Sequence, residues 1–93
     1  MGQEEFTALL AAELFDEPVM VEREANGSLD FHAHPFETRA LVLRGELSVQ
    51  TEDGEYTYRE GNAFRLAANV PHAERYGSSG VSLLVGRKAP TGS

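Results

Sequence analysis

Residues 27–45 read GSLDFHAHPFETRALVLRG. This stretch contains two histidines one residue apart, His32 and His34, in a segment with strand character. Residues two apart on a β-strand project from the same face and lie roughly 6.5 Å apart, so both imidazoles can converge on one metal ion. The pair alone is weak evidence for a metal, because two surface histidines on an edge strand have the same spacing.

Apolar and polar residues also alternate along most of the chain from Pro18 onward. The alternation predicts short, half-buried strands around six apolar pairs: Val19 and Val21, Leu41 and Leu43, Leu47 and Val49, Tyr56 and Tyr58, Phe64 and Leu66, and Leu83 and Val85. Turn-forming residues separate these pairs at Asn26-Gly27, Arg44-Gly45-Glu46, Asp53-Gly54, Glu60-Gly61-Asn62 and Gly77-Ser78-Ser79-Gly80. Short strands at roughly even spacing are typical of an antiparallel all-β barrel or sandwich.

One short helix is expected at the N-terminus, from Glu4 to Phe15. Its apolar residues recur at spacings of three and four: Phe6, Leu9, Leu10 and Leu14. An isolated helix of about a dozen residues is marginal in water, so we expect this stripe to pack on the barrel. The chain then divides into a helix and lead-in (1–17), one barrel (18–87) and a flexible tail (88–93).

Composition excludes several classes of function. The 93 residues include no cysteine, so neither a disulfide scaffold nor a thiolate metal site is possible. The net charge of −7 opposes binding to a phosphate backbone, and we expect no nucleic-acid partner. The first residues lack the basic start of a secretory signal, and no apolar run is long enough to span a bilayer. We therefore expect a cytoplasmic protein with no membrane partner.

The third and last histidine, His72, follows Pro71 after a predicted strand from Ala63 to Ala68. A barrel strand at this place would bring His72 back toward the first histidine pair. The spacing of two motifs supports this. The first runs from Gly27 through the histidine pair to Gly45, and the second reads GNAFRLAANVPHAERY over residues 61–76.

These motifs resemble those of the cupin superfamily. Its first motif has glycine, His-x-His, glutamate and glycine, and its second has glycine, proline, a second glycine, histidine and asparagine. The fifteen residues between Gly45 and Gly61 match the compact spacing of small bacterial cupins. The resemblance covers about residues 18–86 and implies an all-β, double-stranded β-helix (jelly-roll) barrel. It also implies that His32, His34 and His72 hold a metal ion.

The departures from the family pattern concern the carboxylate ligand. Thr38 occupies the glutamate position, and Glu37 stands one residue early, where a regular strand turns it to the other face. A bulge after Pro35 could turn Glu37 inward as a tentative fourth ligand, and otherwise Glu37 is a solvated surface residue. In the second motif Ala67 replaces the family's proline and Asn69 its second glycine, and asparagine tolerates the left-handed conformation.

Two further residues share the expected strand face of His72. Glu74 is the candidate catalytic base or replacement ligand, and its alternative is a rim glutamate paired with Arg75 or Arg39. Tyr76 stands at the asparagine position of the family motif. It either presents its hydroxyl to a bound substrate or belongs to the core.

Three imidazoles without sulfur suit one divalent ion of Fe, Mn, Zn, Ni or Cu and leave coordination positions open for a ligand. Cupins that resemble this chain include dioxygenases, isomerases and lyases, and also sensor modules that bind a small ligand without catalysis. We expect a metal-dependent enzyme of the dioxygenase or isomerase type that acts on a small oxygen-bearing molecule. The alternatives are a non-catalytic metal- and ligand-binding sensor module and a metal-free barrel.

A homodimer is also expected. Leu41, Leu43, Leu47 and Val49 alternate as the outer apolar face of a barrel strand would. One short chain cannot cover such a face and its sheet edges alone.

Overall fold

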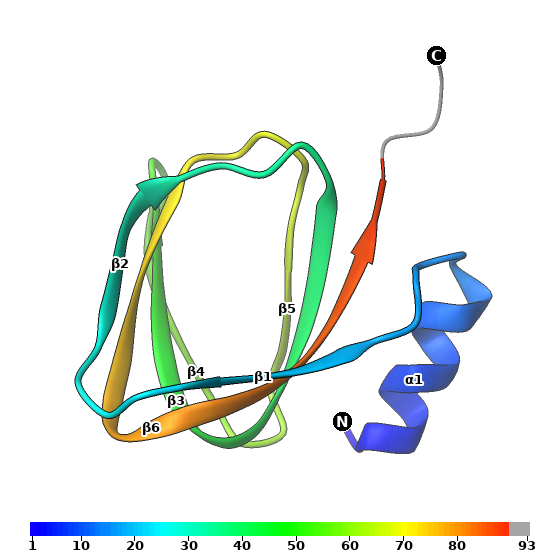
Figure 1. The fold of residues 1–93 in the computed structure, drawn as a ribbon, viewed down its shortest axis with the longest axis horizontal. Coiled ribbons are helices and arrows are strands. Elements are labelled where there is room, and N and C mark those ends of the chain that lie inside the picture. Colours follow the sequence, from blue (N-terminus) through cyan, green and yellow to red (C-terminus); the bar gives the residue numbers. More distant parts are fainter. Residues whose placement is uncertain (90–93) are drawn as a thin grey trace.

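The computed structural model describes residues 1–89 and consists of one helix and an antiparallel sheet of six strands (Figure 1). The elements are α1 (Gln3–Ala12), β1 (Val19–Arg23), β2 (Ser28–His32), β3 (Glu37–Thr51), β4 (Gly54–Arg59), β5 (Ala63–Leu66) and β6 (His72–Lys88). The expected all-β architecture with one N-terminal helix is therefore confirmed. No helix among the described residues is long and apolar enough to cross a membrane.

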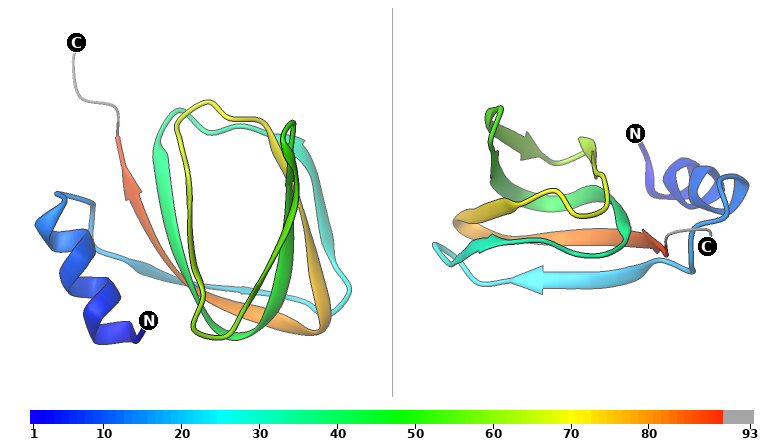
Figure 2. Two further views of the ribbon diagram at one scale, coloured as in Figure 1. Left: turned by 180° about the vertical axis from the view of Figure 1, so that it is seen from behind. Right: turned by 90° about the horizontal axis from the view of Figure 1, so that it is seen from above.

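The sheet is built around its two long strands, β3 and β6, which pair with each other over most of their length. Two short strands pair with each long strand, one along each of its halves. β1 and β2 pair with β6, and β4 and β5 pair with β3. Figure 2 shows the resulting succession, with β1 and β2 along one edge, then β6, then β3, and β4 at the far edge. The strands thus curve around a shared interior.

Both long strands bend at a glycine with positive φ, Gly45 (79°) in β3 and Gly80 (74°) in β6. A Cβ atom on Gly45 would lie 2.0 Å from the carbonyl oxygen of Gly80, so the two backbones cross too closely for any side chain. The pairing register of β3 and β6 shifts on both sides of Arg44. The turns that the sequence predicted at 44–46 and 77–80 are therefore wrong, because these glycines form bulges within continuous strands.

The bulges also change which residues of β3 face the interior. Ala40 and Val42 lie in the barrel core, and beyond the register shifts Leu47 and Val49 lie in that same core. Leu41 faces the other way and is covered by α1. The outer apolar face that the sequence predicted is therefore only half right: Leu41 and Leu43 face outward and pack with α1, whereas Leu47 and Val49 face the core because the extra residue reverses the alternation along the strand.

Helix α1 packs on the outside of the β3–β6 pair (Figure 1). Phe6 and Leu10 are buried there against Leu41 and Leu84. Gly86 permits this close contact, since a Cβ atom on it would lie 2.6 Å from a methyl carbon of Leu10. The expected packing is confirmed.

The end of the helix differs from the expectation. The helix stops at Ala12, and Leu14 adopts a positive φ of 64° with 79% of its surface exposed. The next residue, Phe15, is buried in its place. Leu14 was therefore wrongly assigned to the buried stripe, because the chain leaves the helical path before reaching it.

The Asp53-Gly54 turn is confirmed, since the strands on either side of it pair up to Thr51 and Gly54. At the C-terminus, β6 continues to Lys88, so the first residue of the predicted tail belongs to the sheet. Residues 90–93 of that tail lie outside the described residues.

Candidate metal centre

Two histidines of the cluster, His32 and His72, lie at strand ends that pair with each other. His32 is the last residue of β2 and lies directly opposite His72, the first residue of β6. The centroids of their rings are 4.3 Å apart. Antiparallel pairing therefore brings together two side chains that are forty residues apart in the sequence.

His34 lies two residues beyond the end of β2, in the segment that leads to β3. Its carbonyl oxygen accepts a hydrogen bond of 2.7 Å from the backbone N–H of Asn69. Asn69 has a positive φ of 65°, the left-handed conformation anticipated for an asparagine at this position. This bond holds the segment of His34 against the connection between β5 and β6.

The three histidines form one group. One ring nitrogen from each lies within 4.8 Å of the others. The ring of His34 is 4.9 Å from that of His32 and 5.4 Å from that of His72, measured between centroids. The convergence that the spacing predicted is present.

Hydrogen bonds to the backbone set which ring nitrogen is available. Nδ1 of His32 lies 2.7 Å from the carbonyl oxygen of Asp30, and Nδ1 of His72 lies 3.0 Å from that of Val70. A carbonyl oxygen only accepts, so in the neutral form of each ring Nδ1 carries the proton and Nε2 has a free lone pair. Metal-binding histidines commonly have this arrangement, and these residues fit a divalent ion.

The neutral form of His34 is favoured by its surroundings. Burial lowers its pKa below the ordinary value of 6.5, and the nearby His32, His72 and Arg87 lower the pKa further, while Glu74 opposes them. Its ring stacks on Phe36 with centroids 4.9 Å apart. A neutral imidazole is the form that binds a metal.

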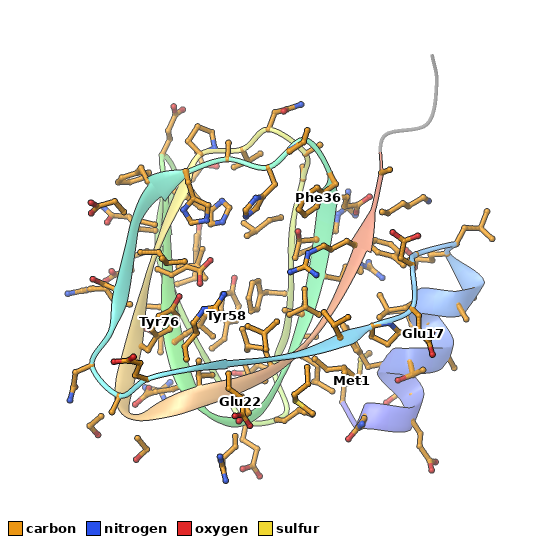
Figure 3. The ribbon with its side chains drawn as sticks, in the orientation of Figure 1. Met1, Glu17, Glu22, Phe36, Tyr58 and Tyr76 are labelled. Atoms are coloured by element: carbon orange, nitrogen blue, oxygen red, sulfur yellow. The ribbon has the colours of Figure 1, made fainter. Side chains whose placement is uncertain are left out.

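The cluster borders an interior cavity of about 140 Å³. Its walls are mostly apolar and come from β1, β2, β3, β5, β6 and the segment before β3: Val21, Leu29, Phe36, Ala40, Phe64, Leu66, Leu83 and Val85. Its polar lining consists of the three histidines, Arg23, Thr38, Glu74 and Arg87. In Figure 3, Phe36 lies beside the start of β3, and Tyr76 lies within the ring of strands on the side of β2 and β6.

Glu74 faces the cavity beside His72. Its Oε2 lies 3.5 Å from Nε2 of His72, and its Oε1 accepts a hydrogen bond of 2.9 Å from the hydroxyl of Tyr76. The alternative partners pair elsewhere, Arg39 with Glu13 and Arg75 with Glu55. Glu74 is therefore not a rim residue in an ion pair.

Tyr76 donates its hydroxyl hydrogen bond to Glu74 from within the core. The tyrosine is 7% exposed and belongs to the core cluster, and its ring does not line the cavity. Burial raises its pKa to about 12, and the charge of Glu74 and its hydrogen bond add to the effect, opposed by Arg23. The hydroxyl therefore stays protonated at neutral pH and remains a donor to Glu74.

A model of the cupin domain family matches residues 19–85, most of the chain and all three histidines. The chain belongs to the cupin family. No curated protein matches it.

Solved structures with similar folds share few identical residues with this cupin. The cupin domain of Schizosaccharomyces pombe Cnp3 is 14% identical, with a TM-score of 0.69, covering 76% of this chain and 50% of that one. An RmlC-like cupin from Shewanella frigidimarina is 19% identical, with a TM-score of 0.66, covering 78% and 66%. The W96F variant of Bacillus subtilis oxalate decarboxylase is 18% identical, with a TM-score of 0.69, covering 82% and 22%. This cupin thus spans half the length of the first structure.

Glu37 does not join the histidines of this cupin. Its carboxylate lies 2.7 Å from Nε of Arg65, outside the cavity, while its neighbour Thr38 lines the cavity. No bulge turns Glu37 inward, because the first register shift of β3 comes after Val42. Among the described residues, Glu74 is the only carboxylate that lines the cavity.

Sequence analysis missed two residues that line the cavity of this cupin, Arg23 and Arg87. Arg23 has the parity of Val21 on β1, and Arg87 has that of Val85 on β6, so strand alternation places both on the interior face. This signal was available in the sequence. It was overlooked because charged strand ends usually face solvent.

Proposed function

We propose that this cupin is a metal-dependent enzyme that acts on a small oxygen-bearing molecule, as dioxygenases and isomerases do. His32, His34 and His72 would hold one divalent ion of Fe, Mn, Zn, Ni or Cu. The observation that carries the proposal is the convergence of three imidazoles on a small, mostly apolar cavity. Three protein ligands leave coordination positions open, which is the pattern of catalytic rather than structural sites.

When bound, the metal would supply Lewis-acid or oxygen-binding chemistry at the end of the cavity. The chain itself provides the proton acceptor. The carboxylate of Glu74 lies beside His72, with 17% of its side chain exposed, so it can take a proton from a molecule bound next to the histidines. The Tyr76 hydroxyl fixes one carboxylate oxygen, and the other remains directed toward the site.

The fold supports catalysis in related proteins, since one of the similar structures is an oxalate decarboxylase. That resemblance concerns the fold, and the assignment of residues rests on the geometry of this chain. Apolar side chains form most of the walls around the site. In such surroundings, one well-placed carboxylate has a large effect on the reaction of a bound molecule.

The test compares two glutamates of this chain. The protein is loaded with Fe(II), Mn(II) or Zn(II) and incubated with a panel of small hydroxy, oxo and enol compounds, and products are followed by mass spectrometry. Glu74→Gln should keep its metal and lose turnover at least about 100-fold, the range of a lost general base. Glu37→Gln, whose carboxylate lies outside the cavity, should retain activity.

Two results would contradict the proposal. A metal-loaded protein that binds a compound of the panel and returns it unchanged is a non-catalytic ligand-binding module. A wild-type protein that takes up none of the three ions has no metal centre at all.

A further inference from the structure

The arginines of this chain divide into two groups. Four of them form ion pairs with glutamates: Arg39, Arg59, Arg65 and Arg75. The other three have no carboxylate within ion-pair distance among residues 1–89, although the chain carries 15 acidic side chains. Two of these three, Arg23 and Arg87, line the cavity, and Arg44 does not.

The two cavity arginines lie at different ends of the site. Arg23, the last residue of β1, pairs in register with Val81 of β6, and its charge acts on the Tyr76 hydroxyl. Arg87 lies near the end of β6, opposite Thr38, and its charge acts on His34. Arg87 is thus the cation next to the histidine cluster on the side away from Tyr76.

The position of Arg87 is supported by an aromatic residue. The guanidinium carbon lies 5.8 Å from the centroid of the Phe36 ring, and that ring stacks on His34. Stacking on an aromatic ring holds a guanidinium while its N–H groups remain free to donate. The N–H groups of a guanidinium match the two oxygens of a carboxylate.

We propose that Arg87 binds the carboxylate of the substrate, and that the substrate is therefore a small carboxylic acid. This inference rests on the proposed function and names its substrate class. Arg87 lies over the ring of Phe36, which stacks on His34, whereas the carboxylate of Glu74 lies beside His72. The acid is oriented with its carboxylate toward Arg87 and its proton-donating carbon or hydroxyl toward Glu74.

The size of the cavity limits the acid. An apolar cavity of about 150 Å³ holds benzene, so this cavity of about 140 Å³ admits a molecule of about six non-hydrogen atoms. Lactate has this size and carries a hydroxyl next to its carboxylate. Lactamide has nearly the same shape without the charge, so the two compounds form a matched pair of probes.

The test measures the affinity of the Zn(II)-loaded full chain for lactate and lactamide by calorimetry. Wild-type protein should prefer lactate. Arg87→Gln should lower the affinity for lactate about tenfold or more, since a charge-assisted pair is lost, and leave lactamide within about twofold. Arg87→Lys, which keeps the charge but not the two-pronged geometry, should lie between them. Arg44→Gln, the unpaired arginine outside the cavity, should match wild type.

A second readout does not depend on the metal. In the metal-free protein, excess lactate should shift the Nε–Hε nuclear magnetic resonance signal of Arg87, and lactamide should not. Equal affinity for the two probes, or an unchanged affinity for lactate in Arg87→Gln, overturns the inference while leaving the metal centre intact. If wild type takes up no Zn(II), the proposed function fails, and the Arg87 signal alone then decides for or against carboxylate binding.

Discussion

Glu74 and Tyr76 show how single residues organise the site. They follow His72 on alternate positions of β6, so all three share the face that points inward. The same rule explains why Glu37 fails to join them and its neighbour Thr38 lines the cavity. A step of one residue along a strand therefore separates a site residue from a surface ion pair.

Removing the Tyr76 hydroxyl should weaken the fold. Tyr76→Phe leaves the carboxylate of Glu74 without its donor in a half-buried place, which should cost about 1–2 kcal/mol in the free energy of unfolding. Urea denaturation measures the difference. Tyr56→Phe is the matched control, because that ring is 51% exposed, and it should change little. Equal stability of both variants would mean that the bond to Glu74 contributes nothing.

The pH dependence of stability should include a contribution from His34. Its pKa is lowered in the folded state by burial and by the two other histidines, so the unfolded chain binds the proton more readily. Stability should fall as the pH decreases through 6.5, and the fall should end below the pKa of the folded state.

The measurement compares metal-free wild type with His34→Gln in urea, between about pH 7.5 and 5.5. Wild type should lose more stability over this range than the variant does. Parallel curves for the two proteins would show that His34 titrates alike in both states.

At the scale of elements, α1 contributes to the barrel through two side chains. Leu10 lies on the buried face of α1 and is 1% exposed, so Leu10→Ala should lower the free energy of unfolding by about 2–5 kcal/mol. Leu14→Ala is the control, since that residue is exposed beyond the helix end, and its effect should stay within about 0.5 kcal/mol. Thermal melts of both variants distinguish a packed helix from one that contributes nothing.

The long strands mark the limit of what could be predicted from the sequence. Alternation located the short strands, and Asp53-Gly54 identified the hairpin between β3 and β4. Gly45 and Gly80 were misinterpreted because a glycine with positive φ serves equally in a turn and in a bulge. Only the pairing of β3 with β6 distinguishes the two, and pairing between distant segments is not visible in local sequence.

The site was more predictable than the strands that carry it. The spacing of His32 and His34 predicted that their rings converge, which they do although His34 lies beyond the end of β2, and the resemblance to a known family added His72. Arg23 and Arg87 were not predicted as site residues, because they line the cavity only through the way strand ends border it. Their roles follow from the three-dimensional arrangement rather than from any motif.

At the scale of the whole molecule, we still propose a homodimer, on a different surface from the one predicted. Of the four residues first predicted for the interface, Leu47 and Val49 lie in the core, and Leu41 and Leu43 pack with α1. Among the described residues, β1 pairs only with β6 and exposes Val19 (44%) and Met20 (54%). An open edge with apolar side chains favours pairing with a second copy. Sedimentation at micromolar concentration should show a dimer and Met20→Glu a monomer, and a monomeric wild type would contradict the proposal.

The metal content of the purified chain shows whether the three histidines hold an ion. Protein prepared without chelator or nickel columns should carry close to one divalent first-row ion per chain by elemental analysis. His34→Ala should reduce the affinity for the metal more than about 100-fold, because it removes one of three ligands. Among the described residues the ring of His34 makes no hydrogen bond, unlike those of His32 and His72, so this substitution should leave the fold intact. Glu37→Gln should bind as wild type does. A wild-type chain that remains free of Zn(II), Mn(II) and Fe(II) in anaerobic titration would contradict the account.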